Sequence, residues 1–260
     1  MTRPLNFLRR LWLARLLAGV ACIWAFPTIG MAAVELPPRV FLIGGSTMAS
    51  YPPERVLVGW GQVFPAHFKD ATMVQNHGRS GRSSKSFIDQ GLWAKVIGEI
   101  AKGDYLIIQF GTNDTKVDDP SRYTEPRGSY RANLERFIRE VRAKGAFPLL
   151  ATSVVRRSWS EAGRFEVAPS EWQDVTREVA AAMDVPLLDL RARTEELECT
   201  LGPEGSKALH LYLPAGKYDA YPKGAADNTH YCEFGARQVA RLAAQEIRRL
   251  QLPLARWLAD

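Results

Sequence analysis

Five short apolar runs, separated by amphipathic segments, constrain the fold of this chain more than any other feature. The runs are RVFLI (39–43), TMVQN (72–76), YLIIQF (105–110), FPLLATSVV (147–155) and VPLLDL (185–190). Most of them are continuously apolar rather than alternating, as expected for strands buried on both faces of a parallel sheet. The sequence therefore predicts a central sheet that is covered on both sides.

Helical patterns fill the intervals between these runs. Apolar residues recur at three- and four-residue spacing in four segments, residues 86–100, 129–145, 170–183 and 235–250. Gly145 closes the second segment, as glycine often does at a helix C-terminus. The alternation, without repeats or linkers, predicts one α/β domain with a mostly parallel five-stranded sheet and helices on both faces.

The first 32 residues have the pattern of a secretory signal rather than of a folded segment. They hold four arginines and no acid, then an apolar stretch, then the small-residue end GMAA. We expect cleavage near Ala33, which leaves a single domain over residues 33–260 that is secreted or periplasmic and has no membrane partner. A retained membrane anchor is the alternative, although Arg15 interrupts the apolar stretch.

Charge does not favour a nucleic-acid partner. The net charge of +6 falls to +2 without the leader, because the leader removes four arginines and no acid. No basic patch with interleaved aromatic residues accompanies this small excess.

The cysteines fit an exported protein. Cys22 lies in the leader, and only Cys199 and Cys232 remain after it. In an oxidising compartment this pair predicts one disulfide, with two buried free thiols as the alternative.

Polar residues follow the ends of successive predicted strands. Ser46 comes after the first strand in GGST, Gly81 after the second in NHGRSG, and Asn113 after the third in GTND, while DNTH (227–230) precedes the last helix. Ligands of open parallel sheets bind outside the carboxyl ends of the strands, where these loops converge. We therefore expect these residues to share one edge of the sheet.

Ser46, Asp227 and His230 can form a nucleophile, an orienting acid and a general base. A serine hydroxyl is a weak nucleophile that needs such a base, and the base needs support from a carboxylate. The backbone N–H groups of Ser46 and Gly81 and the side-chain amide of Asn113 could stabilise an oxyanion. Each motif alone is ordinary loop chemistry, but their joint order after successive strands predicts acyl transfer.

The four blocks resemble those of the SGNH hydrolases, also called GDSL-type esterases. Three further stretches resemble the rhamnogalacturonan acetylesterase branch: GWGQ (59–62), DPSRYT (119–124) and YPKGAADNTH (221–230). The resemblance covers nearly all of the chain after the leader. It implies a flavodoxin-like three-layer α/β/α sandwich.

The resemblance also implies roles for individual residues. Ser46 would be the nucleophile, Asp227 and His230 would complete the triad, and Gly81 and Asn113 would be oxyanion donors. The implied function is an exported carbohydrate O-acetylesterase that removes acetyl groups from a plant cell-wall polysaccharide, pectic rhamnogalacturonan, through a serine acyl-enzyme. The implied partner is therefore an acetylated polysaccharide or oligosaccharide.

One position departs from the family pattern. Gly45 stands where the usual Asp precedes the serine. That Asp is not the triad acid. Its loss is therefore expected to affect the rigidity of the first loop more than the catalytic mechanism. Two other functions stay open: a non-catalytic carbohydrate-binding relative, and an esterase or lipase that acts on other acyl esters.

Two residues near the strand ends are candidates for substrate binding. Trp60 follows the nucleophile loop, and Arg156 follows the fourth predicted strand together with Arg157. Tryptophans are more often core than sugar platforms, and an arginine pair is often a solvated surface. We nevertheless expect Trp60 and Arg156 to contact the substrate.

We expect no cofactor and no metal, and we expect a monomer. The chain lacks a GxSxG elbow, a GxGxxG fingerprint and a P-loop. His77, His210, His230 and Cys232 do not have the spacing of common metal sites.

Overall fold

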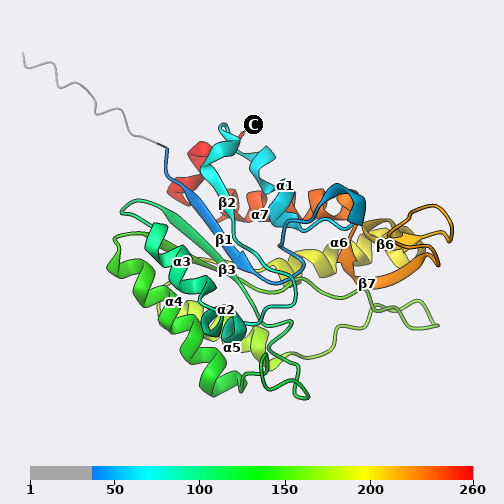
Figure 1. Ribbon diagram of the computed structural model, residues 1–260, viewed down its shortest axis with the longest axis horizontal. Coiled ribbons are helices and arrows are strands. Elements are labelled where there is room, and N and C mark those ends of the chain that lie inside the picture. Colours follow the sequence, from blue (N-terminus) through cyan, green and yellow to red (C-terminus); the bar gives the residue numbers. More distant parts are fainter. Residues whose placement is uncertain (1–36, 260) are drawn as a thin grey trace, which may run out of the picture. The chain divides into compact units, whose positions relative to one another are not determined.

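A five-stranded parallel sheet forms the centre of the protein. The computed structural model describes residues 37–259, and the predicted leader lies outside them. The strands are β1 (Val40–Gly44), β2 (Val74–Asn76), β3 (Tyr105–Gln109), β4 (Phe147–Ala151) and β5 (Leu187–Leu188). They pair in parallel in the order β2-β1-β3-β4-β5 (Figure 1), so the predicted sheet is confirmed.

Helices cover both faces of the sheet and make a three-layer α/β/α sandwich. One face carries α2 (Ser84–Asp89), α3 (Leu92–Glu99), α4 (Arg131–Ala143) and α5 (Glu171–Ala182). The opposite face carries α1 (Trp60–Val63), α6 (Leu190–Gly205) and α7 (Glu233–Arg249), as Figure 1 shows. The three layers confirm the fold class that the sequence predicts.

The continuous apolar runs are explained by two separate cores. Val40 and Leu42 of β1 pack with α7, whereas Phe41 and Ile43 pack with α3 and α4, and all four side chains are fully buried. Successive strand residues point to opposite faces, so a strand between two helix layers needs apolar residues at every position.

Shorter elements join these layers. Five 3₁₀ turns span Pro53–Arg55, Phe64–His67, Ala71–Met73, Ser206–Leu209 and Pro253–Trp257, and a π-helical turn spans Pro126–Tyr130. A separate antiparallel hairpin consists of β6 (His210–Leu213) and β7 (Ala225–Tyr231).

Some element boundaries differ from the sequence-based prediction. The predicted helix over residues 86–100 is broken into α2 and α3 at Gly91, whose φ of +71° is left-handed. The fourth strand ends at Ala151 rather than at Val155. The sequence does not predict α6 or the β6–β7 hairpin, because neither has a run of apolar residues with a clear period.

The predicted disulfide is absent. Cys199 and Cys232 are both free thiols. Cys199 is exposed on α6, whereas Cys232 stands at the start of α7 and its Sγ lies 3.1 Å from the carbonyl oxygen of Ala208. A disulfide requires both sulfurs to face each other within bonding distance, so this prediction was wrong.

No helix within residues 37–259 is both long and apolar enough to cross a bilayer.

Candidate active site

Ser46 stands on a tight turn at the carboxyl end of β1. The carbonyl of Gly45 accepts N–H groups from Met48 at 3.2 Å and Ala49 at 3.1 Å, which reverses the chain at once after the strand. Tyr51 donates its hydroxyl to the carbonyl of Ser46 at 2.8 Å. Gly44 permits the close approach of β3, because a Cβ there would lie 2.7 Å from the carbonyl oxygen of Gln109. The turn therefore holds the Ser46 hydroxyl at the edge of the sheet.

Asp227, His230 and Ser46 form a connected chain of hydrogen bonds. His230 Nε2 lies 3.0 Å from Ser46 Oγ, and His230 Nδ1 lies 2.7 Å from Asp227 Oδ2. Both distances are within hydrogen-bonding range for a nucleophile and its base. The structure thus brings together three residues that are up to 184 positions apart in the chain.

A large bulge in the β6–β7 hairpin explains how Asp227 reaches His230. Leu211 pairs with Asp227, but the preceding residue of β6, His210, pairs with Tyr231. The residues between Asp227 and Tyr231 therefore protrude from the ladder. Asp227 Oδ1 fills the protruding turn by accepting the N–H groups of Thr229 at 2.7 Å and His230 at 3.0 Å. The expected loop is in fact a bulged strand.

These contacts keep Asp227 ionised. Partial burial raises the pKa of this carboxyl, but the His230 ring and the N–H groups of His230 and Thr229 outweigh it and hold the pKa well below its usual range. A fixed negative charge next to His230 Nδ1 stabilises the imidazolium that forms when the base takes a proton.

The three N–H donors that the sequence predicts for an oxyanion are not all placed in the same hollow. Asn113 Nδ2 donates one N–H to the carbonyl of Arg82 at 3.0 Å and keeps a second N–H. The backbone N–H groups of Ser46 and Gly81 have no acceptor within the described part of the chain. Gly81 has a φ of +76°, which only glycine adopts freely. Ser46 and Asn113 line the same cavity, whereas Gly81 lines a neighbouring hollow with Arg82.

Asp114, which is not among the residues predicted from the sequence, supports the third loop. Its carboxylate is fully buried and accepts Ser84 N at 3.0 Å, Gly111 N at 2.9 Å and Thr124 Oγ1 at 3.2 Å, besides the Ser84 hydroxyl at 2.5 Å. Burial raises the pKa of this carboxyl to about 6, although the hydrogen bonds oppose the shift. The position of Asp114 directly after Asn113 in GTND was the available signal.

A second histidine lies behind His230. His210 Nε2 lies 2.6 Å from Glu198 Oε1, and His210 Nδ1 lies 3.3 Å from the backbone carbonyl of His230. Both side chains are buried, and the His210 ring stacks on Tyr231. The pair ties α6 to the strand that carries His230.

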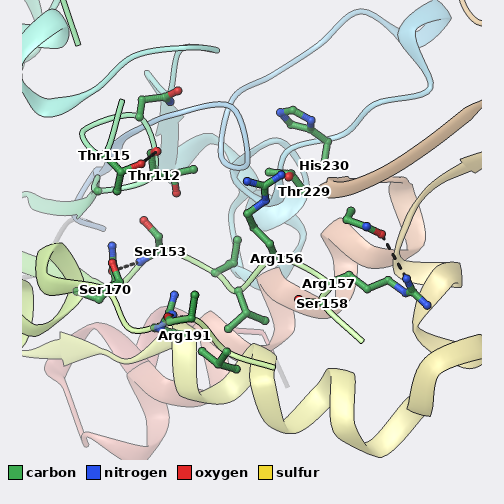
Figure 2. Close-up of a pocket in the computed structure, with 18 of the residues that line it drawn as sticks. Thr112, Thr115, Ser153, Arg156, Arg157, Ser158, Ser170, Arg191, Thr229 and His230 are labelled. Atoms are coloured by element: carbon green, nitrogen blue, oxygen red, sulfur yellow. Dashed lines mark hydrogen bonds between the residues drawn. The ribbon is translucent and has the colours of Figure 1, made fainter. Parts of the chain in front are cut away.

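A cavity of about 810 Å³ opens in front of Ser46 and His230 (Figure 2). Its volume is that of a small-molecule or oligosaccharide site. Hydroxyl and amide side chains supply much of its lining, namely Thr112, Thr115, Ser153, Ser158, Ser170, Gln173, Asn228 and Thr229. Such a lining suits a ligand that is rich in hydroxyl groups.

Trp60 is not part of this cavity, so its prediction as a substrate contact was wrong. The side chain is fully buried in the core below the sheet and packs edge-on against Phe64. Its Nε1 donates to Gln109 Oε1 at 2.9 Å. Trp60 begins α1, on the face of the sheet that also carries α7, and its full burial leaves no surface for a ligand.

The two adjacent arginines have different surroundings. Arg156 is exposed, lines the cavity and extends towards His230 in Figure 2. Arg157 instead binds within the fold: its guanidinium donates to Ser206 Oγ at 3.0 Å and Tyr212 OH at 3.0 Å, and also to the carbonyl of Pro203. Only Arg156 is free to meet a ligand.

The fold and the site together define a class of protein. A hydrogen-bonded serine, histidine and aspartate lie at the carboxyl edge of a parallel sheet, and the chain lacks the nucleophile elbow of other α/β enzymes. This is the arrangement of a serine ester hydrolase. The chain belongs to the GDSL-like lipase/acylhydrolase family, whose sequence model matches residues 42–212.

Individual relatives are similar over most of the chain. Rhamnogalacturonan acetylesterase RhgT from Bacillus subtilis is 42% identical over 222 residues, which are 85% of this chain and 94% of the relative. "Probable rhamnogalacturonan acetylesterase YesY" from the same organism is 33% identical over 83% of this chain and 95% of the relative. The crystal structure of Bacillus subtilis YxiM superposes with a TM-score of 0.69 and 26% identity, covering 84% of this chain but only 58% of YxiM.

Proposed function

We propose that this protein is an exported carbohydrate O-acetylesterase and that its substrate is acetylated rhamnogalacturonan. The observation that carries the proposal is the hydrogen-bonded chain from Asp227 through His230 to Ser46, which opens into a large polar cavity. The similarity to RhgT over 85% of the chain supports the choice of polysaccharide.

In the first half of the reaction Ser46 attacks the acetyl carbonyl. His230 Nε2 accepts the hydroxyl proton as the Oγ–C bond forms, and Asp227 stabilises the resulting imidazolium. The N–H groups of Ser46, Gly81 and Asn113 stabilise the oxyanion of the tetrahedral intermediate. The intermediate then expels the sugar oxygen, which takes the proton from His230, and Ser46 is left acetylated.

In the second half water replaces the sugar. His230 takes a proton from the water as its oxygen attacks the acetyl carbon, and the same donors stabilise the second oxyanion. The intermediate expels Ser46 Oγ, which recovers its proton from His230, and acetate leaves. One base and one oxyanion site therefore serve both steps.

The dimensions of the site favour a short acyl group on a polar alcohol. A second hollow beside Ser46, lined also by Gly45 and Asn113, has a volume of only about 10 Å³. Space of this size is about that of a single water molecule, so the hollow offers no room for a long acyl chain. The large cavity is lined by polar groups. Binding a long apolar acyl chain there would cost free energy, because these groups would lose their hydrogen bonds to water.

The proposal extends to localisation and assembly. We expect export because residues 1–32 have the pattern of a secretory signal, with cleavage near Ala33. The mature protein would then be a monomer, secreted or periplasmic, without a nucleic-acid or membrane partner.

Acetate release tests the proposal. Purified protein is assayed on acetylated rhamnogalacturonan, acetylated xylan and a long-chain nitrophenyl ester, and we expect the highest kcat/KM on the first. Ser46→Ala should lower turnover by several orders of magnitude, as removal of the catalytic serine does in other triad enzymes. Asn113→Ala should lose about 100- to 1000-fold, the usual effect of removing one oxyanion donor.

Two results would contradict the proposal. Wild-type protein that binds the polysaccharide but releases no acetate from any ester would be a carbohydrate-binding relative. A higher kcat/KM on the long-chain ester than on either polysaccharide would indicate a lipase instead.

A further inference from the structure

The cavity in front of Ser46 contains three cationic side chains without a carboxylate partner. Lys116 follows β3, Arg156 follows β4, and Arg191 lies in the first turn of α6. None of the three forms an ion pair within residues 37–259, although arginines elsewhere on the surface, such as Arg127 and Arg136, do. The three cations thus come from three different parts of the chain, and all of them line this cavity.

Arg191 is held in place but not neutralised. Its Nη2 donates to the carbonyl of Ala168, and its backbone N–H donates to Thr152 Oγ1 at 2.8 Å. The carboxylate of Asp189 is already bound by Arg177 at 2.9 and 3.2 Å. Burial of the Arg191 side chain, and then the charge of Arg177, lower the pKa of Arg191, while Asp174, Asp189 and Glu195 only partly offset this. An anion in the cavity would supply the missing partner.

The acids of the cavity do not cancel these charges. Asp227 is bound to His230, and Glu166, which is exposed on the loop between β4 and α5, is one carboxylate against three cations. Arg157, the fourth cation of the lining, is already satisfied by Ser206, Tyr212 and Pro203. The cavity thus has a surplus of available positive charge among the hydroxyl and amide groups that suit a sugar.

Guanidinium groups match the geometry of a carboxylate, to which they donate two parallel hydrogen bonds. We propose that Lys116, Arg156 and Arg191 form a carboxylate subsite, so that the enzyme deacetylates a uronide whose carboxyl group is free rather than its neutral methyl ester. This inference rests on the proposed function, and it adds the charge state of the sugar that the site selects. Figure 2 shows Arg156 and Arg191 among the side chains that line the cavity together with His230.

The subsite also implies an order of reactions. A glycan that carries methyl-esterified carboxyl groups must first lose them, by hydrolysis of each ester with water to a carboxylate, a proton and methanol. That methyl-ester hydrolysis supplies the substrate that this protein prefers.

Two acetylated oligouronides that differ only in methyl esterification test the proposal. For each enzyme form, kcat/KM on both is divided by its kcat/KM on p-nitrophenyl acetate. Wild type should favour the free acid by about tenfold or more, as expected for a charge-assisted hydrogen bond. Arg156→Gln and Arg191→Gln should each reduce this preference severalfold, mainly through KM on the free acid. Rising ionic strength should reduce it as well, because salt screens partly exposed charges.

Arg164→Gln is the matched control. Arg164 is exposed on the same loop as Glu166 but does not line the cavity, so this variant changes the net charge equally and should keep the wild-type preference.

Equal kcat/KM on the two oligouronides in wild type, with no effect of either variant, would overturn the subsite and leave the acetylesterase proposal standing. Failure to release acetate from any ester would defeat the proposed function and the subsite with it. If Arg191→Gln does not fold, Arg156→Gln decides, because Arg156 is exposed and its side chain has no hydrogen-bond or ion-pair partner among residues 37–259.

Discussion

Gly45 is the residue at which the chain departs from the pattern of its family. A Cβ at this position would lie 3.1 Å from Asn113 Nδ2 and 3.2 Å from the carbonyl oxygen of Arg82. These two atoms are hydrogen-bonded to each other, so Gly45 leaves room for a contact that orients an oxyanion donor. The glycine is therefore compatible with a working site and does not by itself indicate a binding protein.

Gly45→Asp should keep kcat on p-nitrophenyl acetate within about tenfold of wild type, because the added Cβ requires Asn113 and Arg82 to shift by only a few tenths of an ångström. Gly45→Ala is the control that separates the effect of the Cβ from that of the carboxylate. A thousandfold loss in both variants would show that the loop cannot accept a side chain, and activity only in Gly45→Asp would mean that the natural chain is inactive.

Asp114 should make the stability of the protein depend on pH. Its folded-state pKa, about 6, lies above the ordinary value of 3.8, so between these values the native state binds a proton that the unfolded state does not. The contribution of this group to the free energy of unfolding therefore increases as pH falls from about 6 towards 4. It is lost as pH rises through the folded-state value.

Urea unfolding of wild type and Asp114→Asn at pH 4.5 and pH 7 measures this contribution. The free energy of unfolding of wild type minus that of Asp114→Asn should be larger at pH 4.5 than at pH 7 by about 2 kcal/mol. Asp118→Asn, at an exposed position of the same loop, is the control and should leave the pH dependence unchanged. An advantage that is independent of pH would mean that Asp114 does not titrate in this range.

At the scale of elements, the β6–β7 hairpin decides where the general base stands. Arg157 connects this hairpin to the segment after β4: its backbone N–H donates to the carbonyl of Asn228 at 2.8 Å, and its side chain donates to Tyr212 OH and to Asn228 Oδ1 at 3.0 and 3.3 Å. The guanidinium also lies over the Tyr212 ring. The hairpin packs outside the main sheet, so these contacts fix the position of Asp227 and His230.

Arg157→Met should lower kcat on p-nitrophenyl acetate by about 10- to 100-fold, because small displacements of a catalytic base cost this much. The loss should appear in kcat rather than in KM, since Arg157 does not meet the ester. Arg164→Met, on the exposed loop that follows, is the control. A variant with wild-type kcat but a lower Tm would show that Arg157 only stabilises the fold.

For the whole molecule, the state of the cysteines can be measured directly. Cys199 and Cys232 are free in the structure, so unreduced and unfolded protein that begins near Ala33 should contain two reactive thiols. Mass spectrometry of the exported protein checks the start of the chain in the same sample. No reactive thiol, or an intact Met1, would contradict the corresponding expectation.

The sequence alone determined the class of fold and the identity of the residues that meet. Apolar runs such as YLIIQF predict strands buried on both faces, and the residues after each strand must gather at one edge, so Ser46, Asn113 and His230 could be placed together before any coordinates. Gly145 likewise marked the end of α4, where its φ is +71°. These inferences succeed because they depend on local patterns of polarity and on the geometry of a parallel sheet.

Only the tertiary structure decided how the side chains are used. Trp60 and Arg157 became internal contacts, Arg156 and Arg191 were left unpaired in a cavity, Asp114 was buried, and Cys199 was turned away from Cys232. Each of these outcomes depends on contacts between segments that are far apart in the chain. Local sequence patterns do not encode the direction in which a side chain points after two elements pack, because packing and burial select that direction when the whole core forms.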